Sequence, residues 1–160
     1  MSVEELAVIV LERCRRLDLK LATAESCTGG LIAGALTEIN GSSDVFECGF
    51  VTYSDKAKFE MLGVDIELLE THGAVSEEAA ISMVEGALAR SRANLAVSVT
   101  GIAGPGGGSA IKPVGLVYMA IAWRGHNAVC YRDVFGGDRM GVRSATVISA
   151  LKRLIEILSR

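Results

Sequence analysis

The chain has 160 residues, half of them apolar and only 5% aromatic, and a formal net charge of −3. This length suits one domain with an ordinary two- or three-layer core, so we expect a single domain over residues 1–160. The acidic balance excludes the basic face of a nucleic-acid-binding protein. No apolar run approaches the roughly 18 residues that cross a bilayer, and the N-terminus has no secretory cleavage pattern. We therefore expect no nucleic acid and no membrane as partners.

The cysteines and histidines form no metal-binding or redox pattern. Cys14, Cys27, Cys48 and Cys130 contain no CxxC pair, which disfavours a zinc site or a redox motif. We interpret them as the reduced thiols of a cytoplasmic protein. The two histidines stand far apart in turn-like contexts, and we expect both at the surface. These patterns predict no metal and no cofactor.

The expected elements alternate between helix and strand. Ser2 and Glu5 form a capping box that opens the first helix, and Ser76 is the expected cap of a long amphipathic helix. In chain order the sequence predicts helix 2–17, strand 19–24, helix 29–39, strand 45–53, helix 54–63, a turn of helix at 65–70, helix 76–90, strand 95–99, a hairpin of 114–123 and 128–135, and helix 139–158.

Strands separated by helices, with one hairpin near the end, predict an α/β fold. We expect a layered α/β/α domain with a mostly parallel, mixed central sheet. In such sheets a ligand binds beyond the carboxyl ends of the strands. Three loops leave strands here and are the places to search for a site: ESCTGG at 25–30, YSDKAK at 53–58 and TGIAGPGGGS at 100–109.

Ser26 stands out by its position, because the generic catalytic motifs fail on spacing. A GxSxG elbow needs glycines where the chain has Ala24 and Thr28, and the glycine-rich loop matches neither a P-loop nor GxGxxG. Ser26 lies between a strand end and a helix start, where the backbone N–H groups of residues 27–30 can stabilise an oxyanion or hold a phosphate. The alternative is that Ser26 or Thr28 is only the N-cap of the helix.

A serine nucleophile needs a proton acceptor, and neither histidine is placed to serve. The candidates are Glu25, Tyr53, Lys56 and Lys58. Lys58 can accept a proton if desolvation and nearby cations favour its neutral amine; the alternative is a solvated surface lysine. Cys27 is a rival nucleophile, because a helix N-terminus lowers a thiol pKa.

Six motifs together carry a family resemblance. In order along the chain they are AESCTGG, GFVTYSDKAK, HGAVS, SVTGIAGPGGG, KPVG and FGGDR. They closely resemble the C-terminal domain of the competence/damage-inducible CinA proteins, which is also found as a stand-alone nicotinamide mononucleotide amidase. The resemblance covers essentially the whole chain, and its most specific part is AESCTGG combined with TGIAGP. We carry over no activity of the additional N-terminal domain of the larger CinA proteins.

The resemblance implies hydrolysis of the carboxamide of nicotinamide mononucleotide to nicotinate mononucleotide and ammonia, a step of pyridine nucleotide salvage. It implies Ser26 as nucleophile, Lys58 as the group that accepts its proton and later protonates the leaving nitrogen, and Tyr53 as the residue that orients Lys58 or relays the proton. Arg139 is the expected ligand of the 5′-phosphate, since a guanidinium matches phosphate oxygens. The substrate-binding residues implied are Thr28, Gly29, Gly30, Thr100, Gly101, Gly104 and Arg139.

Two other functions stay open from the residues alone. One is a non-catalytic module that senses pyridine nucleotides or binds a partner, linked to competence or DNA damage. The other is an amidase of the same fold acting on another substrate. The resemblance, the high apolar content and the long terminal helix also lead us to expect a homo-oligomer, a dimer or larger.

Overall fold

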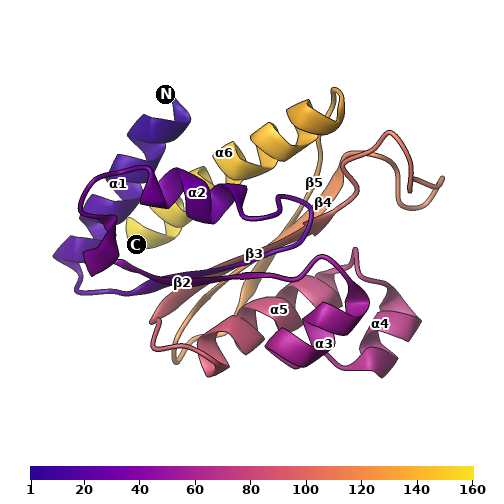
Figure 1. Cartoon of the computed structure of the whole chain (residues 1–160), viewed down its shortest axis with the longest axis horizontal. Coiled ribbons are helices and arrows are strands. Elements are labelled where there is room, and N and C mark those ends of the chain that lie inside the picture. The colour runs from indigo at the N-terminus through magenta and orange to yellow at the C-terminus, as the bar shows by residue number, and fades with distance from the viewer.

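The computed structural model describes all 160 residues and has three layers, a five-stranded sheet between two groups of helices (Figure 1). Helices α1, α2 and α6 cover one face, and α3, α4 and α5 cover the other. The strands are β1 (Leu21–Glu25), β2 (Phe46–Val51), β3 (Leu95–Gly101), β4 (Leu116–Trp123) and β5 (Val129–Val134). The helices are α1 (Val3–Arg16), α2 (Leu31–Thr37), α3 (Asp55–Leu62), α4 (Ile66–His72), α5 (Glu77–Ala89) and α6 (Arg139–Leu158), with a 3₁₀ turn at Ser42–Asp44.

The strand order β2-β1-β3-β4-β5 places β1 and β3 at the centre of a mixed sheet. β1 pairs in parallel with both β2 and β3, whereas β4 runs antiparallel to β3 and to β5. Four strands therefore run in one direction and only β4 runs against them. The layered α/β fold and its mixed sheet are confirmed. Glu25, the last residue of β1, pairs with Val51 and Val99, so three strands end at the same edge of the sheet.

Local capping signals locate most helix starts correctly. The capping box of Ser2 and Glu5 is present at α1, and the hydroxyl of Ser76 accepts the N–H of Ala79 at α5. The helix expected from residue 29 begins later, at Leu31, because Gly29 and Gly30 have φ values of 59° and 107°. That left-handed backbone suits glycine and cannot continue a right-handed helix.

Two apolar cores hold the layers together, one on each face of the sheet. α1 and α6 pack on one face through Leu, Ile and Val side chains. The other core is rich in alanine and lies between the sheet and α5. All five residues of β1 are buried, including the charged Glu25. A carboxylate at the end of a fully buried strand needs hydrogen-bond donors close by. None of the helices combines the length and apolar character needed to span a membrane.

Two helical glycines provide a matched test of this packing. A Cβ at Gly86 of α5 would lie 2.1 Å from the carbonyl oxygen of Leu62, whereas a Cβ at Gly34 of α2 meets nothing within 4 Å. We expect Gly86→Ala to lower the free energy of unfolding by about 1–3 kcal/mol through overpacking. Gly34→Ala should raise it by about 0.5–1 kcal/mol through helix propensity. Urea denaturation of both variants checks the pair, and a stabilised Gly86→Ala would contradict the close contact of α3 with α5.

Candidate active site

Ser26 lies in a tight turn that begins directly after β1. Its backbone N–H donates to the carbonyl of Val99 on β3 at 3.0 Å, and its carbonyl accepts the N–H of Gly29 at 2.9 Å. Gly29 has the left-handed backbone that this turn requires. The side chain of Ser26 is largely buried, with 9% of the residue exposed. The turn therefore fixes the serine at the sheet edge where three strands end.

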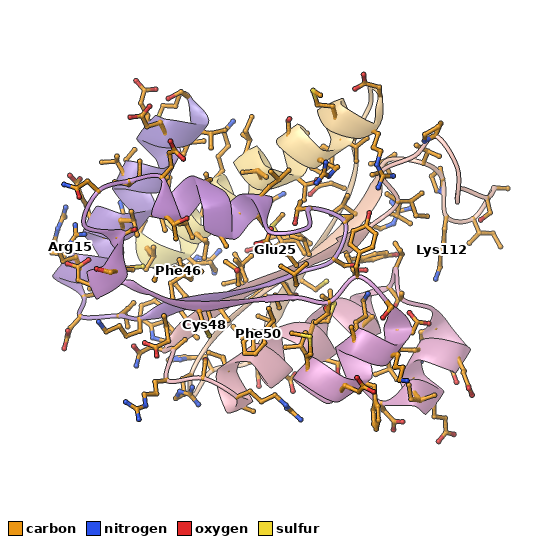
Figure 2. All side chains as sticks on the ribbon, in the orientation of Figure 1. Arg15, Glu25, Phe46, Cys48, Phe50 and Lys112 are labelled. Carbon is orange, nitrogen blue, oxygen red and sulfur yellow. The ribbon has the colours of Figure 1, made fainter.

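Glu25, and neither Ser26 nor Thr28, caps helix α2. Its carboxylate accepts the backbone N–H groups of Ile32 at 2.8 Å and Ala33 at 3.0 Å, and the hydroxyl of Thr28 at 2.7 Å. Figure 2 shows Glu25 between the start of α2 and the sheet. The interpretation of Ser26 as a helix cap is thus wrong, and its hydroxyl is available for another contact. Glu25 is occupied by these three donors, which leaves it unsuited to serve as the base.

The hydroxyl of Ser26 contacts Lys58. Nζ of Lys58 donates to Oγ of Ser26 at 3.1 Å and to the carbonyl oxygen of Thr52 at 2.9 Å. Lys58 is 1% exposed and forms no salt bridge. Burial lowers the pKa of Lys58 from its ordinary value of 10.5, while the carboxylate of Asp55 and the thiol of Cys27 act in the opposite direction. Burial thus shifts this amine toward its neutral form, and a neutral amine in contact with a hydroxyl can accept the proton of that hydroxyl.

The rival groups in this region are less suited to the chemistry. Lys56 is exposed and pairs with Glu60 across one turn of α3. The thiol of Cys27 is buried, and burial raises its pKa to about 11. The expectation that the helix start lowers this thiol pKa is wrong, because the effect of burial is larger and raises it. A thiol with a raised pKa forms little of the reactive thiolate at neutral pH.

Tyr53 and Arg139 are joined by a hydrogen bond. Tyr53 is 57% exposed, and its hydroxyl accepts a hydrogen bond of 2.7 Å from Nη2 of Arg139. Nη1 of the same guanidinium donates to the carbonyl of Gly104 at 2.8 Å. No hydrogen bond joins Tyr53 to Lys58, so the expected contact between these two is not formed in this structure. Arg139 instead connects the loop after β2 with the glycine-rich loop after β3.

A pocket of about 670 Å³ opens beside this arginine. Arg143, which the sequence analysis missed, lines the same pocket one helical turn further along α6. Its Nε donates to the carbonyl of Cys27 at 3.1 Å, and its Nη2 donates to the carbonyl of Thr28 at 3.2 Å. The i, i+4 spacing of the two arginines on a helix was the only available signal. The pocket is lined by Ala103, Pro105, Val114, Gly137, Asp138, Arg139, Met140 and Arg143.

The predicted binding residues of β3 and its loop have packing roles in the structure. Thr100 is buried, and its hydroxyl donates to the carbonyl of Ala74 at 2.8 Å. A Cβ at Gly101 would lie 2.7 Å from the Val117 side chain, and Gly104 has a φ of 84°. These three residues therefore shape the loop that forms one wall of the pocket. No three His, Cys, Asp or Glu side chains gather where they could hold a metal ion.

Several backbone donors around Ser26 have no partner. The N–H groups of Cys27, Thr28 and Gly30 form no hydrogen bond with another residue. The carbonyls of Ser26, Cys27 and Thr28, in contrast, are all bound, the first by Gly29 and the other two by Arg143. A nucleophile, a buried amine and unpaired N–H donors are thus gathered beside a pocket that contains two arginines.

Comparison with known proteins identifies the family of the chain. A sequence profile of the CinA C-terminal domain matches residues 3–158. The chain belongs to the CinA C-terminal domain family. The nicotinamide-nucleotide amidohydrolase PncC of Shigella flexneri is 52% identical over 134 residues, which cover 84% of this chain and 81% of that protein. A CinA-like protein of Akkermansia muciniphila is 52% identical over 139 residues, or 87% of this chain, but the match spans only 34% of that longer relative.

Solved structures of the family have the same fold over the full chain. A competence/damage inducible protein from Agrobacterium tumefaciens superposes with a TM-score of 0.95 at 55% identity, covering 100% of both chains. The competence damage-inducible protein A of Klebsiella pneumoniae superposes with a TM-score of 0.96 at 38% identity, over 100% of this chain and 99% of the other.

The depressed pKa of Lys58 has a consequence for stability. Between that pKa and 10.5 the unfolded chain binds more protons at this residue than the folded chain, so the contribution of Lys58 to the free energy of unfolding rises with pH across this window. Lys58→Met, which replaces the amine with an apolar side chain of similar length, should lack this rise. The check is urea denaturation of both proteins from pH 7 to 10.5. Parallel stability curves would contradict a depressed pKa.

Proposed function

We propose that this protein is a nicotinamide-nucleotide amidohydrolase, which converts nicotinamide mononucleotide to nicotinate mononucleotide and ammonia. The observation that carries the proposal is the contact of 3.1 Å between the Ser26 hydroxyl and the buried amine of Lys58. The names of the PncC relatives, at 52% identity, support the choice of substrate. The chemistry supports the choice of reaction, because an amide carbon needs a nucleophile, a base, oxyanion donors and a proton for the leaving nitrogen.

The reaction then proceeds in two halves. The neutral amine of Lys58 accepts the Ser26 proton while Oγ attacks the amide carbon, giving a tetrahedral oxyanion. The unpaired N–H groups of Cys27 and Thr28 stabilise this oxyanion. Lys58 returns the proton to the departing nitrogen, ammonia leaves, and a nicotinoyl ester of Ser26 remains. Water attacks the ester with Lys58 again accepting a proton, which releases the carboxylate product and restores the serine.

The pocket on α6 holds the remainder of the nucleotide in this proposal. The guanidinium of Arg139 lines it, and guanidinium groups bind phosphate oxygens through paired hydrogen bonds. Tyr53 is hydrogen-bonded to Arg139 in the free protein, and in this proposal substrate binding releases its hydroxyl to orient Lys58 or relay the proton. Thr28, Gly29 and Gly30 line the approach to the serine in this scheme.

The compartment, the oligomeric state and the cofactor requirement of the enzyme are also part of the proposal. We place it in the cytoplasm as a homo-oligomer of two or more chains, acting without a metal or other cofactor. Light scattering on the purified protein measures the assembly directly, and ammonia release in the presence of a chelator tests the expected independence from metals.

The first test of the proposal compares two neighbouring residues. Ser26→Ala should lower ammonia release from nicotinamide mononucleotide by a factor on the order of 10³ or more, because it removes the nucleophile. Cys27→Ala should retain turnover, since the buried thiol has a raised pKa and takes no part. The opposite ranking would assign the chemistry to the thiol. Nucleotide binding by the wild type without ammonia release would move the protein to the class of nucleotide sensors.

The second test concerns the phosphate. Arg139→Met should raise the KM for nicotinamide mononucleotide by about 10- to 100-fold, as expected for loss of charge-assisted hydrogen bonds. Turnover of nicotinamide riboside, which lacks the phosphate, should change far less. Arg132→Met, at an exposed position on β5, is the matched control. An equal loss with nucleotide and riboside would show that Arg139 only supports Tyr53 and Gly104.

A further inference from the structure

Glu25 is a buried carboxylate that the proposed reaction does not use. It is 1% exposed and forms no salt bridge, and its three hydrogen-bond donors are all uncharged. A buried carboxylate is costly unless its oxygens are satisfied. The residue lies directly before the proposed nucleophile, at the end of β1. Its position calls for an explanation beyond simple helix capping.

The carboxylate fills the anion-binding position of α2. The free N–H groups at a helix start attract anions, and here those of Ile32 and Ala33 are bound to Glu25. A substrate oxyanion therefore cannot use them. The donors that stay free near Ser26 are the N–H groups of Cys27 and Thr28, which belong to the turn and not to the helix. The orientation of this turn thus decides whether an oxyanion is stabilised.

Two side chains hold the turn. Glu25 binds the hydroxyl of Thr28 at 2.7 Å, and Arg143 binds the carbonyls of Cys27 and Thr28. The C=O and N–H of one trans peptide point in opposite directions. Because Arg143 holds the carbonyl of Cys27, the N–H of Thr28, in the same peptide, points away from the arginine. Gly29 likewise holds the carbonyl of Ser26, which directs the N–H of Cys27 away from Gly29.

We infer that Glu25 is a positioning residue for the oxyanion hole. By binding Thr28 and the start of α2 together, it fixes the peptide planes so that the N–H groups of Cys27 and Thr28 are presented to the oxyanion. The inference rests on the proposed amidase reaction. Glu25 touches no reacting atom and acts through Thr28. A neutral, isosteric glutamine at this position cannot accept all three hydrogen bonds, because its amide NH₂ meets a donor.

The decisive measurement compares an amide with a thioamide. Sulfur is a weaker hydrogen-bond acceptor than oxygen, so an oxyanion hole favours nicotinamide mononucleotide over thionicotinamide mononucleotide. A loss of folded enzyme lowers both rates by the same factor and leaves their ratio unchanged. A displaced oxyanion hole lowers the amide rate more than the thioamide rate. The ratio of the two rates is measured with enzyme in excess, so that slow conversion of the thioamide is still observed, and kcat and KM for the amide are measured separately with substrate in excess.

For Glu25→Gln we expect kcat for the amide to fall on the order of 10²-fold, with KM changed by no more than about twofold. The preference for amide over thioamide should fall with it. Thr28→Val removes the hydroxyl without changing the shape of the side chain and should reproduce the effect if Glu25→Gln does not fold. Glu47→Gln, at an exposed position on β2, is the control.

The possible results distinguish failure of the inference about Glu25 from failure of the proposed amidase function. An equal loss on both substrates would make Glu25 a structural cap only and overturn the inference. Full activity in Glu25→Gln would overturn it as well. No ammonia release by the wild type would instead refute the proposed amidase, which the wild-type measurement detects before any variant is compared.

Discussion

The site depends above all on the burial of the Lys58 amine. An ammonium group removed from water costs several kcal/mol unless a carboxylate compensates it, and Lys58 has only a hydroxyl and a carbonyl as partners. Neither partner carries a negative charge that would offset the loss of hydration. The fold brings them together because the chain leaves β2 at Thr52, and α3 then carries Lys58 back to the end of β1. The depressed pKa, the contact with Ser26 and the capacity for proton transfer all follow from this placement.

Helix α6 links the nucleophile to the pocket. Its two arginines lie one turn apart, so one binds the loops that carry Tyr53 and Gly104 while the other binds the turn after Ser26. The helix itself is fixed by apolar packing against α1 and the sheet. In the proposed function a phosphate bound at Arg139 is thereby held at a constant distance from the reacting serine. The energy of binding the phosphate, away from the reacting amide, can then help to orient the amide for attack.

The parts of this structure that are local in sequence could be predicted, and the parts that depend on distant contacts could not. The serine caps and the alternation of helix and strand follow from neighbouring residues, and the contact of Ser26 with Lys58 was expected from the family resemblance. The contact of Arg143 with the turn spans more than a hundred residues, so no motif contains it. Glu25 was considered only as a base, because a sequence does not show that a strand-end side chain reaches the next helix. The partner of Tyr53 was missed for the same reason as Arg143.

The charges of the proposed substrate and product favour first the neutral and then the protonated form of Lys58. Nicotinamide mononucleotide brings a pyridinium cation toward Lys58, and a nearby positive charge further disfavours the ammonium form. Binding thus favours the neutral base at the moment when Ser26 must lose its proton. The product carries a new carboxylate at the same carbon, which favours a protonated lysine. The carboxylate of Asp55 and the thiol of Cys27 oppose the effect of burial on the pKa of Lys58, and burial outweighs them, so the buried site and the substrate cation act on the base in the same direction.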